Sequence, residues 1–284
     1  MSVKTHLATK LLIMSRGAGS MTPEVEAKLR GAFSDHLILD FDPKQDFDAL
    51  ITPEATVVVA GGDGTIGFVV RKLADSKHPV GILSLGTYNN FAKALRIPKT
   101  LSGAIRAIKQ GRPRPITLGR INGTVFLEAA AIGLFGETIA LGEAAKDRVF
   151  GTMAQEMRRV MASKPFRYEL FGDIRGSGAA MSLVFTNTES IGAQMPVGES
   201  SPTDPYLELS VHAGESRTDI VGRVLAASVL HKDNDREKGQ VFRFTKLEIK
   251  TSPKARVYAD NARVGMTPAT ITAEVSALKV ILDR

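Results

Sequence analysis

Two short runs of glycine and polar residues carry the clearest chemical signal in the sequence. The first is Gly61-Gly62-Asp63-Gly64-Thr65, and the second is Gly86-Thr87-Tyr88-Asn89-Asn90-Phe91-Ala92. Each run stands between an apolar stretch typical of a buried strand and a pattern typical of a helix. Glycine lets main chain approach a ligand closely, and a helix N-terminus offers free N–H groups to a phosphate. The runs predict a phosphate-binding site; for either one alone, a purely structural turn is the alternative.

Hydrophobic patterns indicate the strands and helices that must position these runs. Apolar runs typical of buried strands occupy Leu7–Met14, Leu37–Phe41, Ala55–Ala60 and Val80–Leu83. Helices are predicted from Thr22 to about Phe33, after Gly64, after Gly86 through Leu95, and over Leu101–Ile108. Strands that alternate with helices predict an α/β domain with a parallel sheet covered on both faces. Both glycine runs then lie at the carboxyl edge of that sheet, where ligands of such sheets bind.

The pattern changes at Arg112-Pro113-Arg114-Pro115. Beyond it, most stretches are β-type: Pro115–Ile121, Thr124–Ala131, Phe166–Phe171, Ala180–Thr186, Tyr206–His212, Gln240–Lys250, Ala255–Tyr258 and Ala277–Leu282. Two helical patterns interrupt them, around Val149–Met161 and Ile220–Val229. We therefore predict two domains, an α/β domain over 1–112 and a mainly antiparallel β-sandwich with helical insertions over 113–284. The extreme C-terminus is free to pack back on the first domain.

Charge is unevenly distributed. The 37 Lys and Arg residues exceed the 30 Asp and Glu residues, for a net charge of +7. Residues 76–127 contain no acid but nine basic residues: Lys77, Lys93, Arg96, Lys99, Arg106, Lys109, Arg112, Arg114 and Arg120. Such a segment attracts the phosphates of a nucleotide, a nucleic acid or an anionic membrane surface. A solvent-exposed basic surface without a binding role is an equally supported alternative.

Several classes of protein are excluded or disfavoured. The chain has no Cys, which excludes disulfides and thiolate metal sites and fits a reducing compartment. The five His are scattered, and no Gly-Lys-Ser/Thr phosphate loop occurs. A simple Rossmann dehydrogenase is disfavoured because no acid follows Gly62-x-Gly64-x-x-Gly67 at the distance that a ribose requires. With four Tyr and no Trp, few aromatic rings are available to stack on a nucleic acid. The absence of a signal peptide or membrane span predicts a soluble protein.

The two glycine runs together resemble the paired motifs of the diacylglycerol kinase catalytic-domain family, which includes soluble bacterial lipid kinases, sphingosine kinases and ceramide kinases. Ser15-Arg16-Gly17-Ala18-Gly19 stands where that family has an Asn-Pro-x-Ser-Gly turn. Ala131-Ile132-Gly133-Leu134-Phe135 resembles its Gly-Ile-Gly-Phe segment, and Thr186-Asn187 and Asp260 follow in the family's order. The resemblance implies a nucleotide domain, a β-sandwich lipid domain, and an ATP site with Mg²⁺ in the cleft.

The resemblance also implies roles for individual residues. The nucleotide would be bound by Ser15, Arg16, Gly19, Gly61, Gly62, Asp63, Gly64, Thr65, Thr87 and Asn89. Asp63 and Asp260 would be catalytic, with Asp260 as the general base; a simple hairpin turn is the alternative for Asp260. The sequence departs from the family where Asp260-Asn261-Ala262 replaces Asp-Gly-Glu and Asn89-Asn90 replaces Asn-Asp. The metal ligands therefore stay open, with Asp63, Asp204 and Glu137 as candidates.

These features predict a cytoplasmic, ATP-dependent lipid kinase that visits the membrane surface. Its acceptor would be the primary hydroxyl of a diacylglycerol-like or sphingoid lipid such as ceramide. One alternative is an enzyme like NAD kinase, whose family shares Gly-Gly-Asp-Gly-Thr but lacks the second glycine run. The other is a non-catalytic lipid- or nucleotide-binding protein of the same fold, suggested by the acid missing at Ala262. We expect no nucleic-acid partner, and a homodimer stays open.

Overall fold

The computed structural model describes residues 7–138, 158, 160, 162–191, 195–212 and 241–283. The chain divides into two compact units. The first contains Met1–Ile116 and Ser276–Arg284, and the second contains Thr117–Val275. The two helical patterns predicted around Val149–Met161 and Ile220–Val229 lie essentially outside the described residues.

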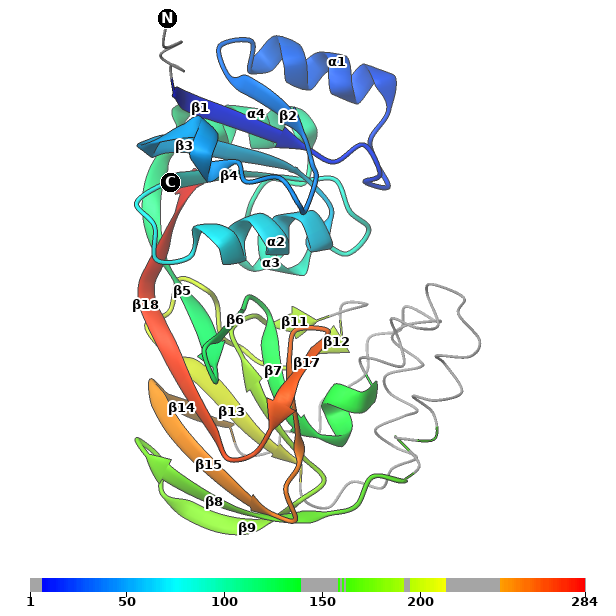
Figure 1. Cartoon of the computed structure of the whole chain (residues 1–284), viewed down its shortest axis with the longest axis vertical. Helices are drawn as coiled ribbons and strands as arrows, with labels where there is room; N and C mark the ends of the chain where they lie inside the picture. Colours follow the sequence, from blue (N-terminus) through cyan, green and yellow to red (C-terminus); the bar gives the residue numbers. More distant parts are fainter. Residues whose placement is uncertain are drawn as a thin grey trace, which may run out of the picture. The chain divides into compact units, whose positions relative to one another are not determined.

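The first unit is built on a parallel sheet in the order β2-β1-β3-β4-β18 (Figure 1). Its strands are β1 (Ala8–Met14), β2 (Leu37–Asp40), β3 (Ile51–Gly61), β4 (Pro79–Ser84) and the end of β18 (Ala269–Leu282). β1, β3 and β4 lie between neighbours, so their apolar runs are buried: Leu11, Leu12 and Val57–Ala60 have no exposed surface. The predicted parallel sheet is confirmed.

Helices cover both faces of this sheet, with α1 and α4 on one face and α2 and α3 on the other (Figure 1). They are α1 (Pro23–Ala32), α2 (Asp63–Leu73), α3 (Asn90–Ala94) and α4 (Leu101–Gln110), and a 3₁₀ turn, η1, spans Asp48–Leu50. Thr22 caps α1 by accepting the N–H of Val25 at 3.3 Å, and Pro23 occupies the first turn, as the sequence predicted. Thr100 caps α4 in the same way.

The second unit is a β-sandwich, as predicted. One sheet is antiparallel in the order β14-β13-β10-β7-β16-β17, and β18, β15, β8 and β9 form the opposite layer together with β5 and β6. Residues of both layers, such as Phe185 and Leu247, pack in one buried cluster. The strands are β5 (Arg112–Ile121), β6 (Thr124–Phe126), β7 (Ala129–Gly133), β8 (Phe166–Gly172), β9 (Gly176–Ala180), β10 (Ser182–Thr186), β13 (Leu207–His212), β14 (Val241–Phe244), β15 (Lys246–Ser252), β16 (Arg256–Ala259) and β17 (Ala262–Met266). A short pair, β11 (Ser190–Ile191) and β12 (Met195–Pro196), stands apart.

Two stretches that were each predicted as a single strand form two separate strands in the structure. Gln240–Lys250 breaks at Thr245, whose N–H and hydroxyl both donate to the Asp173 carboxylate, at 2.7 and 2.6 Å. Thr124–Ala131 breaks at Leu127 and Glu128, whose N–H groups donate to the Asp260 carboxylate. In both places a side-chain carboxylate takes main-chain N–H groups, which ends the ladder locally. Among the described residues, no helix combines the length and the apolar character needed to cross a bilayer.

Candidate functional site

The two glycine runs meet in the first unit. β3 ends at Gly61, Gly62 precedes the first turn of α2, and the N–H of Leu85 donates to Gly61 O at 2.7 Å. A Cβ added to Gly86 would lie 2.9 Å from the Gly62 Cα, so a side chain there would push the two runs apart. The approach of the two main chains requires Gly86, whereas the sequence analysis predicted its glycines only for the approach of a ligand. Thr65 is buried and packs against Gly61.

Asp63 joins the two runs. Its carboxylate accepts the N–H of Asn89 at 3.0 Å. Asn89 has a φ of 52°, in the left-handed region that Asn tolerates better than most residues. Its Oδ1 accepts the Gly86 N–H at 3.0 Å, and its Nδ2 donates to Gly86 O at 2.7 Å. Asn89 therefore braces the turn that precedes α3, while Thr87 is exposed.

The turn after β1 lies beside the same edge. The N–H of Ser15 donates to Ala60 O at 2.8 Å, and the N–H of Ser20 donates to Leu85 O at 3.0 Å. A Cβ on Gly19 would lie 3.9 Å from the Thr87 hydroxyl oxygen. Three turns thus converge at the carboxyl ends of β1, β3 and β4. Their main chain and the N-terminus of α2 form a surface suited to an anion.

Two basic side chains of this region differ in their surroundings. Arg16 donates from Nε to Asp40 at 2.9 Å and lies 3.6 Å from Glu26. The Asp40 hydrogen bond and the charges of Asp40 and Glu26 raise the pKa of Arg16. Burial, reinforced by the charge of Lys99, lowers the pKa of Lys93, while the charge of Asp63 acts in the opposite direction.

The charge of Asp63 thus acts on the Lys93 ammonium group. The sequence analysis counted Lys93 in the basic segment without placing it at the site. Its position four residues after Asn89, in the short helix that Asn89 precedes, is the signal that could have identified it. Arg16, in contrast, is exposed and forms ion pairs with Asp40 and Glu26.

Asp260 belongs to the second unit, in a two-residue hairpin turn between β16 and β17. Its φ is 47°, and its N–H donates to Ala129 O at 2.7 Å. Its carboxylate accepts the N–H groups of Leu127, Glu128 and Ala129 at 3.1, 2.9 and 3.4 Å. The hairpin is confirmed. The carboxylate also fixes the main chain that connects β6 and β7, a role that the sequence analysis did not predict.

Asn187 holds the same connection from the other side. Its Nδ2 donates to Thr117 O and to Leu127 O, both at 3.0 Å, and its N–H donates to Glu128 O at 2.8 Å. Asn187 has no exposed surface. Leu127 and Glu128 are therefore fixed between Asp260 and Asn187.

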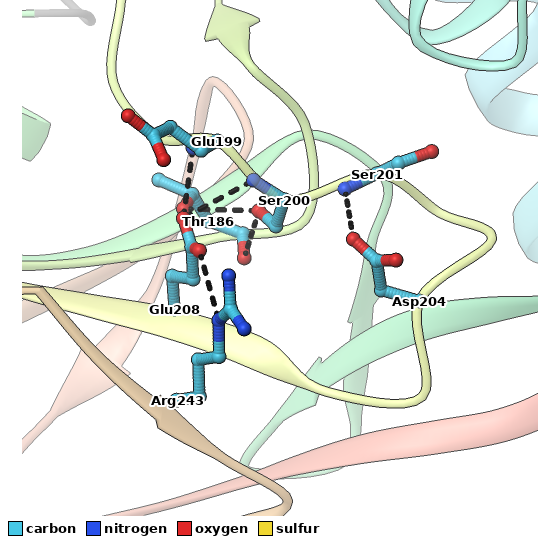
Figure 2. Close-up of polar contacts among 7 residues, drawn as sticks. All are labelled: Thr186, Glu199, Ser200, Ser201, Asp204, Glu208 and Arg243. Atoms are coloured by element: carbon cyan, nitrogen blue, oxygen red, sulfur yellow. Dashed lines mark hydrogen bonds and ion pairs between the residues drawn. The ribbon is translucent and has the colours of Figure 1, made fainter.

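The other metal candidates have polar partners of their own. Asp204 accepts the N–H of Ser201 at 2.9 Å, and its main-chain oxygen accepts the Thr117 hydroxyl. Figure 2 shows this turn beside Glu208, which is 2% exposed and accepts the N–H groups of Glu199 and Ser200 at 2.8 and 3.1 Å. Glu137, also buried, accepts from Arg256 at 2.7 Å. Within the described part of the chain, no three His, Asp or Glu side chains are grouped to hold a metal.

Comparisons with known proteins identify the family of one segment of the chain. Residues 17–121 match the model described as "Diacylglycerol kinase catalytic domain". This segment belongs to that family. The match contains both glycine runs and confirms the resemblance there; Asp260 lies outside it.

Two curated relatives extend the similarity. "Probable lipid kinase YegS-like" from Klebsiella pneumoniae is 33% identical in an alignment of 176 residues that covers 59% of this chain and 59% of that protein. "Diacylglycerol kinase" from Bacillus subtilis is 25% identical over 237 residues, which are 80% of this chain and 78% of that protein. The aligned part thus spans less than two thirds of the Klebsiella protein.

Solved structures share the fold. A diacylglycerol kinase from Bacillus anthracis superposes with a TM-score of 0.70 at 20% identity, covering 99% of this chain and 98% of that one. An NAD kinase from Archaeoglobus fulgidus in complex with ATP gives 0.51 at 14% identity, covering 96% and 93%. At these identities the likeness establishes the fold alone, and this fold is common to lipid kinases and NAD kinases.

Proposed function

We propose that this protein is an ATP-dependent lipid kinase that acts on the primary hydroxyl of a diacylglycerol-like or sphingoid lipid. The observation that carries the proposal is the convergence of the three turns, in a segment of the diacylglycerol kinase catalytic-domain family. In this proposal the turns 15–19, 61–65 and 87–89 surround the phosphates of ATP. The main-chain N–H groups at the start of α2 face negative charge, and Lys93 adds a cation nearby.

The reaction joins the lipid oxygen to the γ-phosphorus and breaks the bond from that phosphorus to the bridging oxygen, which leaves with ADP. The lipid hydroxyl gives its proton to a carboxylate, for which the resemblance names Asp260. Because the chemistry is mainly positioning and charge stabilisation, the arrangement of the turns and of Lys93 matters most. We assign peripheral association with a membrane, where such a lipid resides.

The oxygen donors of the site fit Mg²⁺, which prefers carboxylate and phosphate oxygens. Of the three candidates, Asp204 and Glu137 accept from Ser201 and Arg256, and only Asp63 stands among the converging turns. We therefore assign Asp63 as the residue that would hold the ion together with ATP. Bound there, Mg²⁺ would neutralise phosphate charge.

The test is incubation with labelled ATP, Mg²⁺ and vesicles that contain diacylglycerol, ceramide, sphingosine or phosphatidylglycerol, with NAD as a separate acceptor. We expect label in diacylglycerol or ceramide. Label in NAD alone would establish the alternative, an enzyme like NAD kinase. ATP or lipid binding without transfer to any acceptor would establish a non-catalytic binding protein.

Asp63→Ala tests the assignment of the nucleotide site. We expect turnover to fall by about 100-fold or more, because the variant loses both a charge and the hydrogen bond to Asn89. Glu54→Ala is the matched control, since Glu54 is exposed on the same strand that leads to Asp63. Full activity of Asp63→Ala would overturn the assignment.

A further inference from the structure

An acid follows the turn after β1 at the spacing that ribose recognition requires. Gly17 and Gly19 lie in this turn, and Asp40 is the last residue of β2. In dinucleotide-binding α/β sheets, an acid about 20 residues after a glycine turn hydrogen-bonds a ribose hydroxyl, while the phosphates lie at the turn itself. Asp40 stands at about this distance from the two glycines. The sequence analysis considered such an acid only after the run that begins at Gly62, and so did not select Asp40.

A direct side-chain contact places the Asp40 carboxylate beside this turn. Arg16, within the turn, donates from Nε to Asp40 Oδ1 at 2.9 Å. The main chain is fixed here, because Met14 pairs with Asp40 in the parallel ladder and the N–H of Phe41 donates to Met14 O at 2.7 Å. The Asp40 side chain is 56% exposed, and within the described residues its Oδ2 accepts no hydrogen bond. One carboxylate oxygen is therefore held by Arg16, while the other is open to a ligand.

The order of the strands sets the distance between Asp40 and the turns that we assign to the phosphates. β2 lies beside β1, and β1 lies beside β3, whose end at Gly61 leads to Asp63. Neighbouring strands are about 4.8 Å apart, so the ends of β2 and β3 are separated by about 10 Å. This separation is close to the reach from the terminal phosphate to the ribose hydroxyls of an extended ATP. A nucleotide whose last phosphate lies near Asp63 therefore reaches Asp40 with its ribose.

We propose that Asp40 accepts a hydrogen bond from a ribose hydroxyl of the bound nucleotide and makes the site prefer ribonucleotides to deoxyribonucleotides. The inference rests on the proposed function, with the phosphates of ATP at the turns 15–19 and 61–65. A hydrogen bond with an ionised partner is about twice as strong as one between neutral groups, so a carboxylate is an effective acceptor for a hydroxyl. Arg16 orients this carboxylate through Oδ1 and offsets its negative charge near the phosphates.

Two other acids of this region are placed differently. Glu26 lies on α1, where it pairs with Arg30 at 2.8 Å, and its side chain is 25% exposed. Asp42 is exposed beyond the end of β2, and its carboxylate accepts the N–H of Lys44 at 2.8 Å in a turn of its own. Asp40 is therefore the acid that combines a place at the strand end with a contact to the turn. Asp42, an exposed Asp two residues further on, provides the matched control.

The experiment measures the affinity for ADP, 2′-deoxy-ADP and 3′-deoxy-ADP by calorimetry in the presence of Mg²⁺. It compares the wild type with Asp40→Ala, Arg16→Gln and Asp42→Ala. Binding of ADP needs no lipid, so the result does not depend on the acceptor. We expect the wild type to bind ADP about tenfold or more tightly than at least one deoxy analogue, because that analogue leaves the carboxylate without its hydroxyl partner. Asp40→Ala should lose this preference, and Asp42→Ala should keep it.

The ratio of the affinities distinguishes recognition of the ribose from support of the turn. If Asp40 served only to hold Arg16, Asp40→Ala and Arg16→Gln would weaken the binding of all three nucleotides by one factor. Thermal unfolding of each variant shows whether it is folded. A preference for ADP that survives in Asp40→Ala, or a wild type with no preference, would overturn the role of Asp40 and leave the lipid kinase intact. A wild type that binds no ADP would overturn the proposed function, and the role of Asp40 with it.

Discussion

At the residue scale, the general-base role that we propose for Asp260 and its main-chain contacts require opposite properties of its carboxylate. As a base it must be ready to take a proton, whereas its three main-chain donors favour the ionised carboxylate. A turn alone would accept either Asp or Asn, because both offer a side-chain acceptor. In the structure, however, both carboxylate oxygens of Asp260 accept N–H groups.

Asp260→Asn should therefore destabilise the second unit as well as slow the reaction. An amide nitrogen in place of one oxygen would face an N–H donor, at a cost of about 1–3 kcal/mol in the free energy of unfolding. Denaturant unfolding measures this cost. Glu248→Gln, the same change at an exposed position of β15, is the control. Turnover should also fall by about 100-fold if Asp260 is the base. Unchanged stability would show that the N–H contacts contribute little.

At the scale of elements, the sequence was most informative where the hydrophobic pattern and the residues that end helices agree. Thr22-Pro23 and Gly111 mark the ends of helices, and both bound helices in the structure. Parallel strands buried on both faces are uninterrupted apolar runs, so β3 and β4 were predictable. The breaks at Glu128 and Thr245 were not, because each depends on a carboxylate distant in sequence, Asp260 or Asp173.

The contact between the two glycine runs gives a prediction for the elements they join. Gly86→Ala would place a Cβ 2.9 Å from Gly62 Cα and 2.8 Å from Asn89 Oδ1, so the turn before α3 must move away from α2. We expect the affinity for a non-hydrolysable ATP analogue, measured by calorimetry, to fall about tenfold or more. Gly17→Ala is the control, because a Cβ there meets nothing within 4 Å. Equal affinities of the two variants for the ATP analogue would show that nucleotide binding does not depend on the Gly62–Gly86 contact.

At the scale of the whole molecule, the chain enters the first unit twice and the second unit once. β18 pairs antiparallel with β15 through Ala269–Thr272 and parallel with β4 through Lys279 and Val280. Ser276, with a φ of 62°, lies between the two parts. Only Ala277–Leu282 was predicted as a strand, although the alternation of apolar and polar residues over Ala269–Ala273 is itself typical of a strand with one buried face. The division of the chain at Ser276 could not be predicted from local patterns, since it depends on which strand of each unit pairs with β18.

The end of β18 is therefore expected to stabilise the first unit although it comes from the other end of the chain. Deleting residues 276–284 removes Leu278 and Val280, which have no exposed surface, and Ile281, which is 8% exposed. Burial of such side chains contributes about 1.5–3 kcal/mol each, so we expect a loss of several kcal/mol. Thermal unfolding measures it, with a chain that ends at Leu282 as the control. A truncated protein as stable as this control would show that β18 contributes little to the first unit.

The uneven charge of the chain leads to a prediction about membranes. Arg106 and Lys109 are exposed on α4, and Arg112 is exposed just after it, within the segment that contains no acid. If they face lipid headgroups, replacing all three with Gln should weaken binding to anionic vesicles by about 1 kcal/mol per charge. The loss should shrink as salt rises, because exposed charges are screened beyond about 8 Å at physiological ionic strength. Vesicle sedimentation over a range of salt concentrations measures both effects.

A second triple variant distinguishes a specific surface from the overall charge of +7. Arg167, Lys246 and Lys250 are exposed on β8 and β15 of the second unit, and their replacement by Gln removes the same three charges. Attraction through net charge alone depends on the number of charges removed, whereas a docked surface depends on which charges touch the headgroups. We expect the α4 variant to lose clearly more binding at low salt than the second variant. Equal losses would assign vesicle binding to net charge, and no loss in either would leave the segment as an ordinary solvated face.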